Sequence, residues 1–145
     1  MINVCLIGYG EWGKKVFNSL KNIKQIKEIQ LIKNRRDKTK INFKNLEWIF
    51  ITTNVASHYH LVKKYLNKRI NVFCEKPLTN SIKKDLELYE LAKENKWDHV
   101  LIVEDDILFT QPDKFKHQFE RFLSNETINW DVLLLAGNNL PPYEK

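Results

Sequence analysis

The sequence has few of the features that mark secreted or membrane-spanning proteins. Two cysteines occur in 145 residues. Cys5 and Cys74 both fall inside apolar runs, which favours buried thiols in a reducing, cytoplasmic setting over a disulfide. No apolar run approaches the roughly 20 residues of a membrane span. The N-terminus lacks a basic segment before its short apolar run, so a signal peptide is not predicted.

Charge is unevenly distributed along the chain. The formal net charge is +6, but residues 1–76 carry 16 Lys and Arg against 5 Asp and Glu, whereas residues 77–145 carry 8 against 13. This split is compatible with an anionic ligand, a nucleic-acid surface, or two segments of different origin. We disfavour nucleic acid as a partner because no aromatic interleaving or known motif accompanies the basic residues. Nothing in the sequence indicates an oligomeric state.

Glycine is also scarce, but three of the four glycines lie within residues 8–13. They follow a chain-initial apolar run and precede an amphipathic pattern at helical spacing, an order that predicts strand, tight turn and helix. Such a turn directs backbone N–H groups and a helix N-terminus at a pyrophosphate. Gly8 would permit the turn, Gly10 would let phosphates approach the backbone, and Gly13 would let helix and strand pack closely. A glycine turn without a ligand is the alternative.

Apolar runs alternate with helical patterns along the rest of the chain. This order predicts an α/β, Rossmann-like three-layer fold with a mostly parallel sheet. The segment 37–46 is polar and has room for a short helix at most, so the fold is expected to be shortened by one helix–strand unit after the second strand. Strands are predicted at residues 2–7, 28–33, 48–53, 71–75, 99–103 and 131–136, and helices at 11–23, from Ser57 to about Leu66, at 81–95 and at 115–123.

Two helix starts and one helix face follow from local patterns. Ser57 and Ser81 are predicted N-caps. Residues Ile82, Leu86, Tyr89 and Ala92 recur at helical spacing and are predicted to form one apolar face.

The second predicted strand lacks the acidic residue that would bind the adenosine ribose of NAD. It ends instead in Lys33-Asn34-Arg35-Arg36. Two guanidinium groups there favour the 2′-phosphate of NADP, if a dinucleotide binds. A solvated basic loop is the alternative.

Three segments resemble the N-terminal NAD(P)-binding domain of the Gfo/Idh/MocA oxidoreductases over residues 1–96. They are Gly8-Tyr-Gly-Glu-Trp-Gly13, Ile51-Thr-Thr-Asn-Val-Ala-Ser-His-Tyr-His60 and Asn71-Val-Phe-Cys-Glu-Lys-Pro-Leu78. The resemblance implies hydride transfer between NADP or NAD and a sugar, inositol or related polyol, with Lys76 as the catalytic residue. The substrate domain of that family has no counterpart here, so we expect an incomplete module. The cofactor-binding residues implied are Gly8, Tyr9, Gly10, Glu11, Trp12, Gly13, Asn34, Arg35, Thr53, Asn54, His58, Glu75, Lys76 and Pro77.

Residues 97–145 contain Asp98-His-Val-Leu-Ile-Val-Glu-Asp-Asp-Ile-Leu-Phe109, the apolar positions from Phe119 to Leu123, and Trp130-Asp-Val-Leu-Leu-Leu-Ala-Gly137. These segments resemble a fragment of family 25-type glycosyltransferases, and we expect this strand–helix–strand segment to continue the same sheet. In that family an acidic cluster after a strand holds a divalent cation against a sugar-nucleotide diphosphate. The resemblance implies that Glu104, Asp105 and Asp106 would bind Mg²⁺ or Mn²⁺, which prefer carboxylate oxygens. A turn or helix cap is the alternative for this cluster. A metal and sugar-nucleotide binder, or an inactive fused remnant, is therefore the second reading of the chain.

Overall fold

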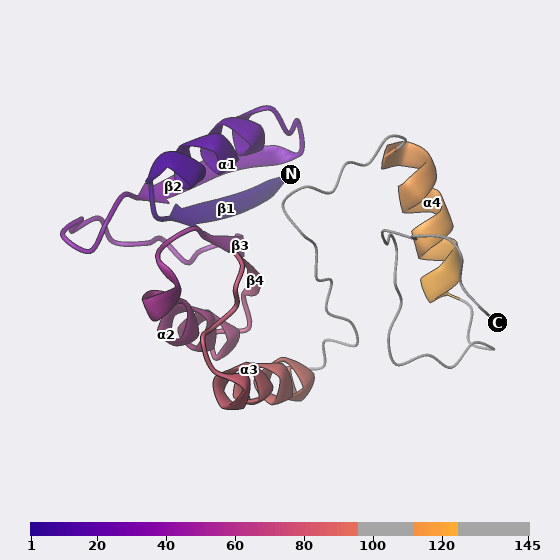
Figure 1. Ribbon diagram of the computed structural model, residues 1–145. Coiled ribbons are helices and arrows are strands. Elements are labelled where there is room, and N and C mark those ends of the chain that lie inside the picture. Colours follow the sequence, from indigo (N-terminus) through magenta and orange to yellow (C-terminus); the bar gives the residue numbers. More distant parts are fainter. Residues whose placement is uncertain (96–111, 125–145) are drawn as a thin grey trace, which may run out of the picture. The chain divides into compact units, whose positions relative to one another are not determined.

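The computed structural model describes residues 1–95 and 112–124 (Figure 1). The chain divides into two compact units, Met1–Ile102 and Val103–Lys145. The first unit contains β1 (Ile2–Ile7), α1 (Glu11–Lys21), β2 (Ile26–Ile32), β3 (Leu46–Ile51), α2 (Val55–Leu66), β4 (Asn71–Cys74) and α3 (Ile82–Glu94), and the second contains α4 (Pro112–Leu123).

The four described strands form one parallel sheet in the order β2-β1-β3-β4. The first strand therefore lies inside the sheet, with Val4 between Ile29 of β2 and Trp48 of β3. The next two strands in the chain, β2 and β3, lie on opposite sides of β1. The carboxyl end of β1 is therefore a topological switch point. This arrangement confirms the predicted α/β, Rossmann-like fold.

The connection between β2 and β3 contains neither helix nor strand, as the polar composition of this segment predicts. Its return path is fixed by Gln30 on β2, whose side-chain amide donates to the carbonyl oxygen of Asn42 (2.9 Å) and accepts from its backbone N–H (2.8 Å). Ile41 packs against the core cluster beside this anchor. A short irregular segment therefore stands where a helix and a strand would otherwise continue the fold.

The core cluster lies between the sheet and the helices α2 and α3. Alternation along β1 sends Cys5 and Ile7 to this cluster and Val4 and Leu6 to the opposite face, and all four are buried. In Figure 1, α1 covers one side of the sheet, whereas α2 and α3 lie on the other. The buried members of the cluster are Cys5, Ile7, Leu46, Ile49, Ile51, Val62, Tyr65, Leu66, Ile70 and Leu88.

The prediction that Ser57 caps α2 is wrong. The helix begins at Val55 with Asn54 as its N-cap. Ser57 lies inside the first turn, where its hydroxyl contacts that of Thr53 (2.7 Å) and donates to the carbonyl oxygen of Asn54 (2.8 Å). Ser81 does occupy the N-cap of α3, although its side chain makes no capping hydrogen bond.

The predicted apolar face of α3 is also wrong, except at Ala92. Leu88 and Ala92 are buried, whereas Ile82, Leu86 and Tyr89 are 80%, 58% and 50% exposed. The helix carries two apolar stripes at helical spacing, and periodicity alone does not say which one meets the sheet. The described first unit therefore keeps an exposed apolar stripe on α3.

The helix predicted at residues 115–123 is present as part of α4. The strands predicted at 99–103 and 131–136 lie outside the described residues. None of the helices within residues 1–95 and 112–124 is long and apolar enough to cross a membrane.

Two buried groups and one partly buried group make the stability of the fold sensitive to alkaline pH. Burial raises the pKa values of Cys5, Tyr65 and Cys74 to about 12, from ordinary values of 9.0, 10.0 and 9.0. As the pH rises, the unfolded chain releases these protons at a lower pH than the folded chain does. The contribution of these groups to the free energy of unfolding is therefore complete below about pH 9 and is lost as the pH rises toward 12. Urea unfolding should give a lower free energy at pH 10.5 than at pH 8, with a smaller decrease in Cys74→Ala. An identical decrease in both proteins would contradict this assignment for Cys74.

Candidate functional site

The predicted site residues are brought together because the parallel strands end at the same edge of the sheet. Gly8 follows β1, Lys33 follows β2, Thr52 follows β3 and Glu75 follows β4. Ligands of open α/β sheets bind in the crevice outside the carboxyl ends of the strands. The candidate site therefore consists of the residues at these four strand ends.

The glycine turn after β1 has a different requirement at each glycine. Gly8 has a φ of +102°, and a Cβ there would lie 2.7 Å from the carbonyl oxygen of Thr52. A Cβ on Gly13 would lie 2.2 Å from the carbonyl oxygen of Gly8, so this residue lets α1 pack directly on the turn. A Cβ on Gly10 would meet nothing within 4 Å. Two glycines therefore shape the turn, and the middle one faces open space.

The start of α1 has the donors that an anion needs. Gly10 is the N-cap, and no side chain caps the first turn. The amide groups of this turn and the helix macrodipole favour a negative group placed at Gly10. Because the space at Gly10 is open, the residues present fit the pyrophosphate of a dinucleotide.

Thr52 fixes the turn from the neighbouring strand, a role that was not predicted from the sequence. Its backbone N–H donates to the carbonyl oxygen of Ile7 (2.9 Å). Its buried hydroxyl donates to the carbonyl oxygen of Gly8 (2.8 Å). The signal available in the sequence was a pair of threonines after a buried strand. It did not indicate which of the two, Thr52 or Thr53, faces the turn.

The other side chains of the turn lie at the surface or partly exposed. The carboxylate of Glu11 pairs with the ammonium group of Lys14 at 2.8 Å, and the hydrogen bond from this lysine lowers the pKa of Glu11. Trp12 is 39% exposed. The ring of Tyr9 contacts that of Phe17 edge-on, with 5.5 Å between centroids. The acidic residue of the turn is therefore compensated by a neighbouring cation.

A carboxylate does reach the end of β2, although the sequence places it five residues beyond the strand. Asp37 accepts the backbone N–H of Lys33 (2.8 Å) and that of Thr39 (3.0 Å). Hydrogen bonds from Thr39 and Lys33 lower its pKa to about 2. Asn34 accepts the backbone N–H of Arg36 (2.8 Å) in the same loop. The loop is thus held by its own polar side chains, and Arg35 and Arg36 are exposed on it.

His58 connects two parts of the site from inside the protein. Its ring is 1% exposed, with Nε2 at 2.9 Å from the carbonyl oxygen of Thr53 and Nδ1 at 2.9 Å from that of Pro77. A neutral imidazole donates to one such oxygen, whereas an imidazolium donates to both. The ring therefore holds the segment after β3 against the segment after β4. Asn54, beside it, is exposed.

The segment after β4 carries the predicted catalytic residue. The backbone N–H of Glu75 donates to the carbonyl oxygen of Ile51 (3.0 Å), which extends the parallel pairing by one residue. The Glu75 carboxylate accepts the backbone N–H of Lys76 at 3.2 Å. Lys76 is exposed, and the Lys76–Pro77 peptide bond is cis. The lysine side chain therefore starts from a fixed strand end.

No cluster of three or more His, Cys, Asp or Glu side chains that could hold a metal ion occurs within residues 1–95 and 112–124. The predicted metal cluster, Glu104, Asp105 and Asp106, lies outside the described residues. The metal site therefore stays a prediction.

Comparison with known protein sequences agrees with this geometry. Residues 37–101 match the family model of the Gfo/Idh/MocA oxidoreductases, described as an oxidoreductase family with an NAD-binding Rossmann fold. The uncharacterized oxidoreductase C115.03 of Schizosaccharomyces pombe is 28% identical over 111 residues, and the match covers 66% of this chain and 30% of that protein.

Solved structures show the same fold. A Gfo/Idh/MocA family oxidoreductase from Vibrio cholerae matches 66% of this chain and 36% of its own, with a TM-score of 0.56 and 20% identity. The myo-inositol 2-dehydrogenase of Lactobacillus plantarum matches 65% of this chain and 33% of its own, with a TM-score of 0.54 and 23% identity. The N-terminal two-thirds of the chain thus has the same Rossmann fold as these oxidoreductases, and the chain spans about a third of the length of these relatives.

The three glycines should differ sharply in their tolerance of a methyl group. Gly13→Ala forces α1 away from the carbonyl oxygen of Gly8 and should cost at least about 3 kcal/mol of unfolding free energy. Gly10→Ala meets open space and should cost no more than about 1 kcal/mol, the price of a poorer N-cap. Urea unfolding of both variants measures the difference, and equal losses would contradict the close packing at Gly13.

Proposed function

We propose that residues 1–95 bind a nicotinamide dinucleotide, with its pyrophosphate against the turn from Gly8 to Gly13. The observation that carries this proposal is the open space at Gly10, between two glycines that shape the backbone and beside an uncapped helix start. The φ of −72° at Gly10 does not require glycine, so the absence of a side chain there supports a ligand placed against this backbone.

The loop after β2 supports NADP over NAD. Ribose recognition in NAD uses a carboxylate at this strand end. Here both oxygens of Asp37 accept backbone N–H groups of the loop, whereas Arg35 and Arg36 are exposed. A guanidinium group forms paired, charge-assisted hydrogen bonds with a phosphate. Asn34 and Arg35 would therefore contact the adenosine side of the cofactor.

The strand ends β3 and β4 would form the nicotinamide side. Thr53 and Asn54 would lie along it, while His58 would act through the two carbonyl groups that it holds. A bound nicotinamide ring supplies the hydride chemistry. The ammonium group of Lys76, with Glu75 and Pro77 beside it, would orient a substrate hydroxyl and stabilise the alkoxide that develops as hydride leaves.

A sugar or polyol is the substrate class that this proposal implies. The resemblance of the Glu75-Lys76-Pro77 segment to Gfo/Idh/MocA oxidoreductases supports it, and one of the matched structures is a myo-inositol 2-dehydrogenase. Oxidoreductase activity, which also needs a substrate pocket, belongs to the proposal because the chain spans about a third of its relatives.

The glycosyltransferase-like reading and the cytoplasmic setting stay predictions. The acidic cluster that would carry the former, Glu104 to Asp106, is outside the described residues. Binding of a UDP-sugar that depends on Mn²⁺ would support this reading, and failure of both ligands would favour an inactive remnant.

Calorimetric titration with NADPH tests the cofactor proposal. Gly10→Asp supplies a good helix cap and should leave stability intact, but its carboxylate would occupy the phosphate position. It should weaken NADPH binding at least about tenfold, which corresponds to roughly 1.4 kcal/mol. Asn22→Asp, at the far end of α1, makes the same change of charge and should bind like the wild type. Wild-type protein that binds neither NADPH nor NADH would refute the proposal.

A second titration tests the choice between the two cofactors. Arg35→Ala removes a guanidinium partner of the 2′-phosphate and should weaken NADPH binding about tenfold, with less than about a twofold effect on NADH. Lys27→Ala removes an exposed cation from the opposite end of β2 and should change neither affinity. Equal effects of Arg35→Ala on the two cofactors would contradict a role in 2′-phosphate recognition.

A further inference from the structure

The surface of α3 carries an apolar stripe that its own unit leaves exposed. Ile82, Leu86 and Tyr89 are 80%, 58% and 50% exposed, and Lys93 continues the same line with its ammonium group 5.4 Å from the centre of the Tyr89 ring. The spacing of four, three and four residues is that of a seam between two packed helices. Three large apolar side chains in one line form a patch rather than isolated surface residues.

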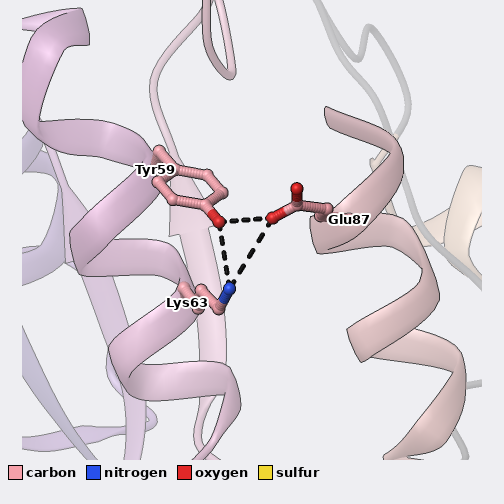
Figure 2. Close-up of polar contacts among 3 residues, drawn as sticks. All are labelled: Tyr59, Lys63 and Glu87. Carbon is pink, nitrogen blue, oxygen red and sulfur yellow. Dashed lines mark hydrogen bonds and ion pairs between the residues drawn. The ribbon is translucent and has the colours of Figure 1, made fainter. Parts of the chain in front are cut away.

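A polar clamp fixes α3 against α2 beside this stripe. Figure 2 shows the Tyr59 hydroxyl and the Lys63 ammonium group of α2 directed at the Glu87 carboxylate of α3. Tyr59 donates a short hydrogen bond to Glu87, while Lys63 lies 3.0 Å from the Tyr59 hydroxyl and 3.6 Å from the carboxylate. Glu87 is thus neutralised within its own chain, near the middle of the stripe.

The flank of the stripe carries charges in a definite order. Lys83 lies near the start of α3 and Glu90 lies seven residues later, about two helical turns away on the same flank. Both are exposed and border an open groove of about 540 Å³ beside α2. Two such helices placed antiparallel would bring the basic start of each beside the acidic part of the other.

We propose that α3 packs antiparallel against α3 of a second copy of this chain, across a two-fold axis beside Leu86. Ile82 of each copy then packs near Tyr89 of the other. Lys83 of each copy faces Glu90 of the other, whose carboxylate also lies 3.6 Å from Lys93 of its own helix, and the two-fold symmetry gives two such ion pairs. Glu87 lies close to the axis, where its repulsion with the same residue of the second copy is offset by Lys63.

One helix pair buries less area than the roughly 1,600 Å² of a standard interface. Association therefore depends on concentration, and the dimer exchanges with the monomer. The stripe contains none of the residues that would hold the dinucleotide. The test of the pairing is therefore independent of the test of the proposed function.

Sedimentation of the full chain over a wide concentration range tests the pairing. Leu86→Glu should leave the chain monomeric at every concentration. Lys83→Glu and Glu90→Lys each place like charges opposite one another at two symmetric positions, and each should weaken dimerisation at least about fivefold. The double variant exchanges the two charges, restores both pairs and should recover dimerisation to within about twofold of the wild type.

Two controls separate the pairing from general charge effects. Lys24→Glu and Glu28→Lys make the same changes of charge at exposed positions outside α3 and should dimerise like the wild type. Wild-type protein that is monomeric throughout would overturn the proposal, as would a dimer that Leu86→Glu leaves intact. A monomer that Leu86→Glu destabilises to thermal unfolding would show instead that another part of the same chain covers the stripe.

Discussion

The structure depends on one close contact, between the first turn of α1 and the carbonyl group of Gly8. Gly13 has no side chain, so the helix can approach this oxygen to a distance that any Cβ would prevent. The hydroxyl of Thr52 donates to the same oxygen from the next strand. Strand, turn and helix are therefore fixed at one atom, and the open backbone at Gly10 follows from this arrangement. The backbone surface at which we propose that phosphates bind is thus a consequence of packing.

The remaining strand ends are organised by hydrogen bonds from side chains to backbone. Asp37 gathers the loop after β2, and His58 joins the segments after β3 and β4 through two carbonyl groups. These residues shape the edge of the sheet through their hydrogen bonds to its backbone. The exposed groups left at this edge include Arg35 and Lys76, which are cationic. An edge built in this way suits an anionic ligand more than a cationic one.

Much of this fold and of the glycine turn could be predicted from the sequence. The alternation of strands and helices, the missing unit after β2 and the positions of three glycines each reflect local rules that act within a few residues. The role of Thr52, the return of Asp37 to the end of β2 and the burial of His58 depend on contacts between distant segments. The buried face of α3 was predicted wrongly because Ile82, Leu86 and Tyr89 repeat with the same period as the buried Leu88 and Ala92. The period alone does not say which of the two apolar faces packs against the rest of the fold.

The most direct test of the account is an amide NMR spectrum of the ¹⁵N-labelled chain during addition of NADPH. We predict that the largest shifts fall on the backbone N–H groups of residues 8–13, with smaller ones at residues 53–54 and 75–76. Saturable shifts confined to these strand ends would support a pyrophosphate held at the glycine turn. Unchanged signals from residues 8–13 at saturating NADPH would contradict it.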